Sequence, residues 1–419
     1  MAEFIPQPSC ADPHETSSLS VTDAQQRIEQ LLTPLNGWQK VALRDALDQV
    51  LQQTIISPIN VPPYDNSAMD GYAINGADIK ADSFTVTQVG IAYAGQAYTG
   101  QLQTGECIRI MTGAMVPDEC DTVIMQEHVE VTGNQITVHG EHQLGQNVRL
   151  SGEDLSSGDT VLNSGHRITP ADLGLIASLG IAEVQIKQKL KVAFFSTGDE
   201  LRSLGDSLEK GQIYDSNRYT LYGMLKRLDV DIIDMGVVPD QKQALREALL
   251  LASQQADVVI TSGGVSVGDA DYVKEMLEEL GQVDFWKIAM KPGRPLAFGK
   301  INDRLFFGLP GNPVSVMVTF YQFVTPALLQ LSGETNRLKR TMQIECISQI
   351  RKRPGRFEFQ RGILFEDEHG NSKVKITGEQ GSGILRSMSI ANCFILLEEQ
   401  CDGIAPNTVV TVQPFAGLI

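Results

Sequence analysis

The sequence has no surplus of basic residues. Its 419 residues include 34 Lys and Arg against 51 Asp and Glu, which gives a formal net charge of −17 at pH 7. Binding to nucleic acid requires positive side chains that neutralise phosphates, so this balance argues against nucleic acid as the main partner. An anionic small molecule would have to be held by a local basic patch.

Disulfide frameworks and targeting segments are also missing. The six cysteines form no C-x-x-C pair and show no disulfide-framework spacing, which predicts reduced thiols in a cytoplasmic protein. Residues 1–18 are polar and contain proline, and they lack the basic and apolar regions of a signal peptide, so we expect a disordered tail. No apolar run is expected to reach transmembrane length, and no membrane partner is expected.

Two common catalytic motifs are absent. No G-x-x-x-x-G-K-[ST] sequence is present, which excludes a P-loop NTPase, and no G-x-S-x-G sequence supplies the nucleophile of a serine hydrolase. What remains is an ordinary globular composition, with 42% hydrophobic and 20% charged residues, over a length that predicts about three domains.

Between residues 191 and 331 the pattern alternates between β and α. Short apolar runs are separated by amphipathic segments, which is typical of a doubly wound parallel sheet with helices on both faces. The strands are expected at residues 192–196, 231–236, 258–260, 283–288 and 305–308, and the helices at 217–228, 241–254, 272–280 and 313–331.

Two β-rich regions and several helices flank this α/β region. Strands separated by glycines are expected at residues 84–89, 107–111, 122–126, 129–131 and 135–138, and again at 342–347, 357–364, 374–377, 393–397 and 409–412. Helices are expected at residues 20–32, where Ser20 is the cap, at 41–51 and at 169–179.

The predicted fold class is therefore a multidomain α/β protein. A parallel doubly wound α/β domain is accompanied by a discontinuous, α/β-containing N-terminal domain, a β-rich insert domain and a C-terminal β-barrel-like domain. After the tail, the predicted boundaries are 19–62 with 150–188 for the N-terminal domain, 63–149 for the insert, 189–332 for the α/β domain and 333–419 for the C-terminal domain.

The loop after the expected strand 258–260 has the composition of an anion cradle. Gly263, Gly264 and Gly268 let the backbone come close to a ligand, and loop N–H groups and the next helix N-terminus favour negative charge. Asp269 and Asp271 in the same loop would repel a phosphate unless Mg²⁺ bridges them. A tight turn with an Asp cap gives the same pattern, so this loop alone does not decide between the two.

Other polar loops also follow the expected strands, at residues 196–200, 238–240, 287–294 and 308–313. In parallel sheets ligands bind outside the carboxyl ends of the strands, so these loops predict one site. The site would hold acids suited to Mg²⁺ and bases suited to an oxyanion: Asp199, Glu200, Asp215, Asp240, Asp269 and Asp271, with Lys287, Lys291 and Arg294. Because like charges repel, the two lysines are expected to converge only around a bound anion.

The motifs that carry a family resemblance lie at residues 63–73, 110–114, 152–154, 196–201, 261–269, 291–295 and 308–315. In this order they resemble the bacterial molybdopterin molybdenumtransferases, a family of molybdenum-cofactor biosynthesis related to the E domain of gephyrin. The resemblance implies insertion of molybdate into adenylylated molybdopterin, in a Mg²⁺-dependent step that releases AMP. It also implies a four-domain homodimer in which the discontinuous domain dimerises. Each cleft would join the α/β domain of one subunit to the β insert of the other.

The resemblance also implies roles for individual residues. The matching functional positions are Asp70, Thr112, Asp154, Glu200, Asp240, Asp271, Lys287 and Lys291, of which Glu200, Asp240 and Asp271 would bind Mg²⁺ and the lysines would hold molybdate. Positions expected to bind the pterin substrate are Thr197, Gly198, Ser262, Gly263, Gly264, Val265, Ser266, Gly268, Asp269, Arg294, Pro310, Gly311 and Asn312. Arg294 departs from the lysine that the resemblance implies, which replaces a point charge by a planar fork.

Two alternative functions stay open at this point. A molybdopterin adenylyltransferase shares the α/β region, but it typically carries a Gly-Gly-Thr-Gly loop where this chain has Gly263-Gly-Val-Ser266, and it lacks the other domains. A non-catalytic dimeric scaffold of the gephyrin E type is the second alternative, although no docking groove is evident in the sequence. Other proteins of molybdenum-cofactor synthesis are expected as further partners.

Overall fold

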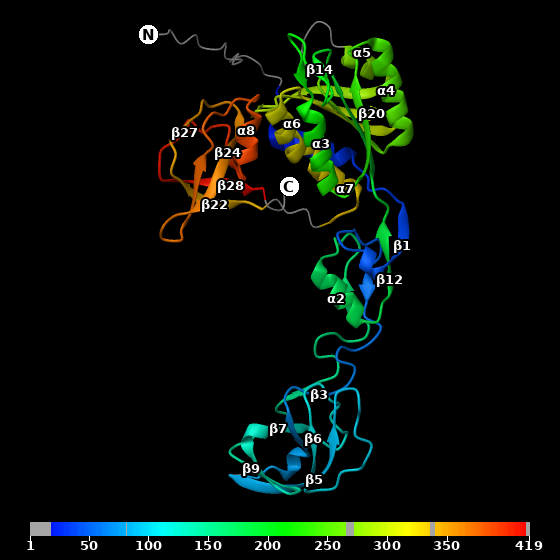
Figure 1. The fold of residues 1–419 in the computed structure, drawn as a ribbon, viewed down its shortest axis with the longest axis vertical. Coiled ribbons are helices and arrows are strands. Elements are labelled where there is room, and N and C mark those ends of the chain that lie inside the picture. The colour runs from blue at the N-terminus through cyan, green and yellow to red at the C-terminus, as the bar shows by residue number, and fades with distance from the viewer. Residues whose placement is uncertain (1–17, 81, 265–271, 336–339, 416–419) are drawn as a thin grey trace. The chain divides into compact units, whose positions relative to one another are not determined.

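The computed structural model describes residues 18–80, 82–264, 272–335 and 340–415. The chain folds into two compact units, one of residues 1–39 with 187–419 and one of residues 40–186 (Figure 1). Almost all of the predicted disordered tail, residues 1–18, lies outside the described residues. The four predicted domain boundaries stay predictions.

The first unit is built on a six-stranded sheet with strand order β16-β13-β17-β21-β20-β18. Its strands are β13 (Lys191–Thr197), β16 (Asp231–Val238), β17 (Val258–Ser262), β18 (Gly281–Lys287), β20 (Pro295–Ile301) and β21 (Arg304–Leu309). The sheet also contains one strand that was not predicted, β20, which runs antiparallel between β18 and β21. The sequence analysis missed β20 since it starts with proline and contains Gly299. A Cβ at Gly299 would lie 2.1 Å from the Gln282 carbonyl oxygen, so the pairing requires glycine.

Helices cover both faces of this sheet, as predicted for a doubly wound domain. Alternate residues of β13 face opposite sides: Val192 and Phe194 pack in the core with α3 (Ser216–Arg227), and Ala193 and Phe195 in the core with α4 (Lys242–Gln255). Helix α5 (Tyr272–Leu280) lies beside α4 (Figure 1). Each buried phenylalanine contributes about 1.5–3 kcal/mol of hydrophobic stabilisation, so the double-sided cover holds β13 in place.

The helix at Pro313–Leu331 forms the centre of the first unit. It consists of α6 (Pro313–Thr319), the π-helical turn η4 (Phe320–Val324) and α7 (Thr325–Leu331). Pro326 has no N–H to continue the α-helical pattern, and the N–H of Thr325 reaches back to the Phe320 carbonyl, which explains the π turn. By length and composition this helix could cross a membrane, contrary to the sequence-based expectation, but 78% of its apolar window is buried inside the protein, as in a core helix.

The C-terminal strands form the predicted barrel. Strands β24-β25-β22-β28-β26 follow one another, and a further pairing of β24 with β26 closes the ring. The strands are β22 (Met342–Cys346), β24 (Phe357–Glu366), β25 (Ser372–Ile376), β26 (Cys393–Leu397) and β28 (Thr408–Pro414). An aromatic cluster of Tyr321, Phe359, Phe394 and Phe415 packs the barrel against η4.

The second unit contains the predicted β-rich insert. Its sheet has the order β7-β4-β6-β5-β9-β8, with β4 (Gly71–Ile74), β5 (Ser83–Ala92), β6 (Glu106–Ile110), β7 (Thr122–Met125), β8 (Val129–Thr132) and β9 (Gln135–His139). All five predicted strands are present. The sequence analysis missed β4 because Asp70-Gly71 has the composition of a turn.

The predicted helix at residues 41–51 is wrong. This segment forms strand β1 (Trp38–Ala42) and the short 3-10 helix η1 (Leu43–Asp45), and Asp48 has a left-handed backbone with φ 61° that interrupts any helix. Several of its backbone N–H groups bind carbonyl groups of distant segments instead, including Leu43 to Ala182 and Leu51 to His166. The predicted helices that begin at Ser20 and Thr169 are present as α1 (Val21–Leu31) and α2 (Pro170–Ser178).

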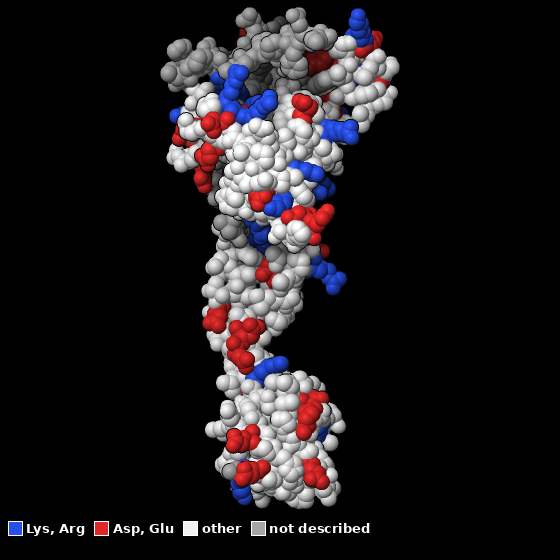
Figure 2. Space-filling view, turned by 90° about the vertical axis from the view of Figure 1, so that its left-hand side faces the viewer, with Lys and Arg blue, Asp and Glu red and all other residues white. Residues whose placement is uncertain are grey.

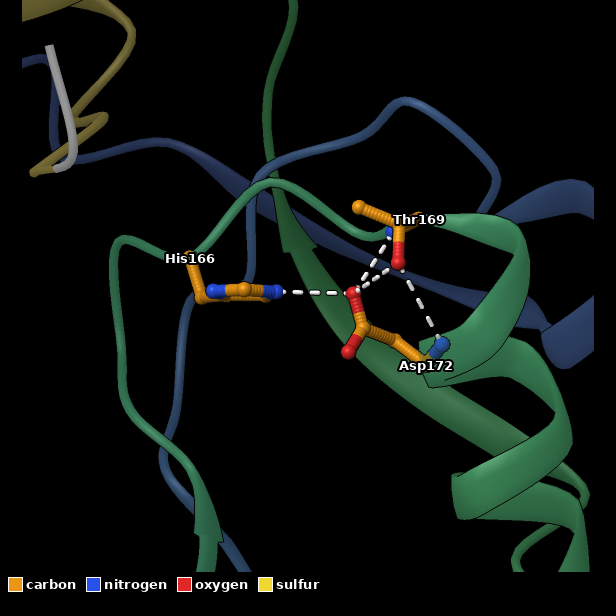
Figure 3. Close-up of polar contacts among 3 residues, drawn as sticks. All are labelled: His166, Thr169 and Asp172. Atoms are coloured by element: carbon orange, nitrogen blue, oxygen red, sulfur yellow. Dashed lines mark hydrogen bonds and ion pairs between the residues drawn. The ribbon is translucent and has the colours of Figure 1, made fainter. Parts of the chain in front are cut away.

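Helix α2 begins with a capping box that includes a histidine (Figure 3). One carboxylate oxygen of Asp172 accepts hydrogen bonds from the Thr169 N–H and hydroxyl, both at 2.7 Å, and lies 2.8 Å from His166 Nε2. Burial acts to raise the pKa of Asp172, but the hydrogen bonds from His166 and Thr169 outweigh it and lower that pKa below its ordinary value of 3.8.

We predict that Asp172→Asn destabilises the second unit in a pH-dependent way. The folded pKa lies below the unfolded one, so the ionised carboxylate stabilises the fold above pH 3.8, and this stabilisation is lost as the pH falls through the folded value. At pH 7 the substitution should cost about 0.5–1.5 kcal/mol, the worth of a typical intramolecular hydrogen bond. The measurement is thermal unfolding of wild type and Asp172→Asn from pH 7 down to the lowest pH at which unfolding is cooperative. It gives the difference in stability between the two proteins at each pH.

Thr169→Ser is the matched control, because it retains the capping hydroxyl and should unfold close to wild type at every pH. A gap between Asp172→Asn and wild type that stays constant down to the acid limit would show that the carboxylate charge is not involved.

Candidate functional site

The predicted rim loops follow strands that end at one edge of the large sheet. Strands β13, β16, β17 and β21 pair in parallel, and β18 runs in the same direction because only β20 between them is reversed. The carboxyl ends are therefore Thr197, Val238, Ser262, Lys287 and Leu309. The loops after these residues contain the described rim positions that the sequence analysis selected.

Glycine is required where β13 and β17 end. Gly263 has a left-handed φ of 94°, and a Cβ there would lie 2.5 Å from the Thr197 carbonyl oxygen. Its N–H donates to the Leu309 carbonyl at 3.1 Å, which joins the end of β17 to the end of β21. Gly264 follows with φ 69°. This backbone is accessible to glycine and strained for other residues, and at Gly263 it allows the close approach to the Thr197 carbonyl. A close approach of this loop to a ligand stays a prediction.

Three carboxylates gather beside this edge. The Asp240 N–H donates to Asp199 Oδ1 at 3.2 Å, and burial followed by the charges of Asp199 and Glu200 raises the pKa of the Asp240 carboxyl. The Glu200 carboxylate folds back over Gly198, where a Cβ would lie 2.6 Å from Glu200 Oε2. Mutual repulsion of this kind is relieved by a cation, and oxygen ligands of this type suit Mg²⁺.

The structure does not display a complete metal centre. Among the residues it describes, no group of three His, Cys, Asp or Glu side chains could hold a metal ion. The third predicted ligand, Asp271, lies outside the described residues, as do Val265, Ser266, Gly268 and Asp269 of the same loop. Two carboxylates fit Mg²⁺, which usually binds one or two acids and completes its shell with water and substrate phosphates.

The basic residues lie at the end of β18 and beyond it. The Lys287 carbonyl accepts a hydrogen bond from Leu19 N at 2.9 Å, and the Arg294 carbonyl accepts one from Ile288 N at 2.8 Å. Lys291 lies in β19 (Met290–Lys291), which pairs with β24 of the barrel. The Lys291 Nζ atom lies 3.8 Å from Glu358 Oε1. The Glu358 side chain is only 7% exposed. Lys291 thus has an acidic partner in the barrel, and the expectation that Lys287 and Lys291 converge only around a bound anion stays a prediction.

Several buried polar atoms near this edge have no hydrogen-bond partner within the described part of the chain. They include Thr197 Oγ1, Asp215 Oδ2 and Asn217 Oδ1. An unsatisfied buried polar group costs about 1–3 kcal/mol, so such a cluster points to a ligand or bound water. Asp215 was noted in the sequence as a rim acid, whereas Asn217 was missed because it belongs to none of the quoted motifs.

In the second unit the predicted pair Asp70 and Thr112 meets directly. Asp70 Oδ1 accepts hydrogen bonds from the backbone N–H and the hydroxyl of Thr112, both at 2.7 Å, and these bonds lower the pKa of the Asp70 carboxyl. Arg109, which the sequence analysis missed, lies over the Tyr72 ring at 5.1 Å and donates to the Gly71 carbonyl at 3.0 Å. The pair is exposed, as a binding surface would be.

Asp154 belongs to the same unit. The residues just before it are hydrogen-bonded to the family motif at residues 63–73. The Ser151 N–H donates to Asp65 Oδ1 at 2.7 Å, and the Asp154 N–H donates to the Val61 carbonyl at 3.0 Å. The motifs at residues 63–73, 110–114 and 152–154 are therefore brought together, because Ser67 N also binds the Ala114 carbonyl at 3.0 Å.

Charge is divided unevenly between the units. Residues 40–186 contain six Lys and Arg against 18 Asp and Glu, so 28 of the 34 basic residues belong to the first unit. On the face drawn in Figure 2, acidic side chains outnumber basic ones on the second unit and the two kinds mix on the first. An anionic substrate is therefore better matched to the first unit.

A cavity of about 470 Å³ lies elsewhere in the first unit, between α1, η4 and the barrel. Gln25, Gln322, Phe357 and Gln413 are among the residues that line it, and it contains no predicted site residue. The cavity therefore adds nothing to the rim chemistry.

Comparison with known proteins identifies relatives over nearly the whole chain. Family models match residues 19–180, described as the MoeA N-terminal region (domain I and II), residues 193–330, described as a probable molybdopterin binding domain, and residues 343–415, described as the MoeA C-terminal region (domain IV). A molybdopterin molybdenumtransferase of Haemophilus influenzae is 45% identical, over 94% of this chain and 97% of that protein.

Two further relatives extend the comparison. A gephyrin of Dictyostelium discoideum is 37% identical over 70% of this chain but 46% of its own length. The solved structure of a molybdopterin biosynthesis moeA protein of Pyrococcus horikoshii matches with a TM-score of 0.84 at 28% identity, covering 95% of this chain and 100% of that chain.

We predict that Gly263→Ala destabilises the first unit. The substitution places a Cβ against the Thr197 carbonyl and a non-glycine residue at φ 94°, a strain of about 1–3 kcal/mol or more. Gly311→Ala is the matched control, because no atom lies within 4 Å of its Cβ position. Thermal unfolding of both variants should show a clear loss for Gly263→Ala only, and equal midpoints would contradict the close approach of β13 and β17.

Proposed function

The chain belongs to the molybdopterin molybdenumtransferase family, and from this we propose that it inserts molybdate into adenylylated molybdopterin with release of AMP. It is a transferase of the molybdenum insertion step in molybdenum-cofactor synthesis. The observation that carries this conclusion is the 45% identity to the Haemophilus influenzae molybdopterin molybdenumtransferase over 97% of that protein. The described rim, with acids on one side and lysines on the other, is consistent with a substrate that carries phosphates and takes up an oxyanion.

The reaction has two parts. In one, water cleaves the phosphoanhydride bond of the substrate, which releases AMP and leaves the pterin phosphate. In the other, two Mo–S bonds form between molybdate and the dithiol, and one molybdate oxygen leaves as water with the two thiol protons. Both parts concentrate negative charge, so the protein must supply positive charge and hydrogen-bond donors.

We assign the Mg²⁺ site to Glu200 and Asp240, with Asp271 as the third acid. When bound there, Mg²⁺ would neutralise the pyrophosphate and polarise the phosphorus under attack. Glu200 and Asp240 lie in the loops that follow β13 and β16, so these two strands would determine where the pyrophosphate binds. The Asp240 N–H donates to Asp199 Oδ1 at 3.2 Å, which places two acids beside each other, and a cation at this position would relieve their repulsion.

We assign molybdate to Lys287 and Lys291, at the far end of the same edge. Glu358 holds Lys291 in place from the barrel, which prepares the ammonium group for a dianion without leaving it unpaired. Ser262, Gly263 and Gly264, with Pro310, Gly311 and Asn312, would line the pterin, while Arg294 would add a third positive charge to those of the two lysines. These roles are proposed from the family resemblance and from the position of each residue at or just after the end of its strand.

We further propose a cytoplasmic homodimer with shared sites. Asp70, Thr112 and Asp154 belong to the second unit. The family resemblance implies that in the dimer these residues lie at the rim of the partner protomer's α/β domain. Other proteins of molybdenum-cofactor synthesis would supply the adenylylated substrate. The adenylyltransferase alternative is disfavoured because family models match the N-terminal, molybdopterin-binding and C-terminal regions of this chain. The scaffold alternative is disfavoured because the gephyrin relative is matched over only 46% of its length.

We predict that Glu200→Gln weakens the response to Mg²⁺. Loss of one charge-assisted contact is worth about 1.5–3 kcal/mol, so the Mg²⁺ concentration for half-maximal AMP release should rise about 10- to 100-fold. The thermal stabilisation of the free protein by Mg²⁺ should shrink in parallel. Glu279→Gln on α5, where the carboxylate pairs with Arg246 at 3.1 Å, is the matched control and should respond like wild type. An unchanged Mg²⁺ response of Glu200→Gln would remove this residue from the metal site.

A second prediction tests the shared site. Asp70→Ala and Asp240→Ala homodimers should each be inactive, because each lacks a required group in both clefts. After subunit exchange the mixture should recover about a quarter of wild-type activity, since half of the dimers are heterodimers with one intact cleft of two. No recovery with verified heterodimers would indicate that each site is built within one protomer.

A further inference from the structure

Asn217 joins three elements at the functional edge of the sheet. It is the second residue of α3, whose cap Asp215 accepts a hydrogen bond from Arg218 N at 3.1 Å. The Asn217 Nδ2 atom donates to Ser262 Oγ at 2.9 Å and to the Gly311 carbonyl at 2.7 Å. One amide group therefore links the helix to the end of β17 and to the loop after β21.

The chemistry of these contacts fixes the orientation of the amide. A carbonyl can only accept, so the NH₂ side of Asn217 must face Gly311, and the same NH₂ group then donates to Ser262. Ser262 Oγ consequently acts as an acceptor toward Asn217, and its own hydrogen remains available to donate. Within the described residues that hydrogen has no acceptor, although Ser262 is only 2% exposed. A buried hydroxyl prepared in this way suits an anionic oxygen or a thiolate.

The surroundings of Asn217 also lack partners. The Asn217 Oδ1 atom and the Asp215 Oδ2 atom are buried without a hydrogen-bond partner in the described part of the chain, and Asp215 is 2% exposed. A contact that served only to stabilise the fold would not leave two acceptors unsatisfied beside it, because each buried acceptor without a partner destabilises the folded state. Unsatisfied acceptors next to a prepared donor are expected where a ligand completes the network.

A comparable hydrogen bond from an asparagine amide to a serine hydroxyl exists at the opposite edge of the same sheet. Asn302, between β20 and β21, donates from Nδ2 to Ser253 Oγ at 3.1 Å. Ser253 lies near the end of α4, just before β17 begins, and its own hydroxyl donates to the Leu250 carbonyl at 2.9 Å. The Ser253 hydroxyl therefore both accepts and donates a hydrogen bond within the protein, which is typical of a contact that only stabilises the fold.

We propose that Asn217 is a positioning residue of the molybdenum insertion site. It orients the Ser262 hydroxyl as a donor and holds the loop after β21 at a fixed distance from the end of β17, so that both receive the adenylylated pterin. This inference rests on the proposed function, since it assigns Asn217 to the binding of the same substrate.

The test compares full-length wild type with Asn217→Ala, Asn217→Asp and the control Ser253→Ala. Molybdate-dependent AMP release is measured over a range of adenylylated molybdopterin at saturating Mg²⁺ and molybdate. Loss of a donor to a charged group corresponds to about a 10- to 100-fold weaker contact, so both Asn217 variants should raise KM for the pterin by that factor. The half-saturating molybdate concentration should change little. Asn217→Asp keeps the shape but not the donors, so equal loss in both variants assigns the effect to hydrogen bonding.

Two readouts separate positioning from a structural role. The thermal midpoints of Asn217→Ala and Ser253→Ala should be similar, while the KM of Ser253→Ala stays at the wild-type value. In the double variant Asn217→Ala with Ser262→Ala the loss in pterin binding should be smaller than the product of the two single losses, because Asn217 acts in part through Ser262.

An unchanged KM in both Asn217 variants, or a loss that multiplies fully with that of Ser262→Ala, would overturn the inference while wild type stays active. Absence of molybdate-dependent AMP release in wild type would instead overturn the proposed function, and this inference with it.

Discussion

The parallel pairing of β13, β17 and β21 is the constraint on which the site of the first unit depends. Because these strands run in one direction, their carboxyl ends meet at one edge, and the loops after them are brought close together whatever their own sequences prefer. Gly263 allows this edge to be tight, since a Cβ there would collide with the Thr197 carbonyl. The helices packed on both faces keep the strands in register.

The same edge separates two kinds of charge. Asp199, Glu200 and Asp240 follow β13 and β16, whereas Lys287 and Lys291 follow β18 at the other end of the strand order. Burial, followed by the charges of Asp199 and Glu200, raises the pKa of Asp240, and the acid Glu358 pairs with Lys291. A single edge can thus hold a cation with phosphates at one end and an oxyanion at the other.

The barrel takes part in this arrangement. Strand β19, which carries Lys291, pairs with β24, and the Val314 N–H at the start of α6 donates to the Ser382 carbonyl at 3.0 Å. The buried Gln322 amide in the π turn donates to Gln413 Oε1 of the barrel at 2.9 Å. These polar contacts, together with the aromatic cluster, couple the barrel to the helix and strand that border the rim.

The motifs were enough to predict the family, and the doubly wound region, the five barrel strands and most strands of the insert were predictable because alternating periodicity and glycine spacing are local signals. The sequence also selected Asp70 with Thr112, which the structure joins by two hydrogen bonds. Tertiary structure decided the rest. The segment 41–51 is not helical, since the N–H groups of Leu43, Asp48 and Leu51 bind residues more than 100 positions away. Strand β20 needs neighbours on both sides to fix its direction, and Asn217 acquires its role only where Ser262 and Gly311 meet it. Such contacts depend on the folded backbone and leave no pattern in the neighbouring sequence.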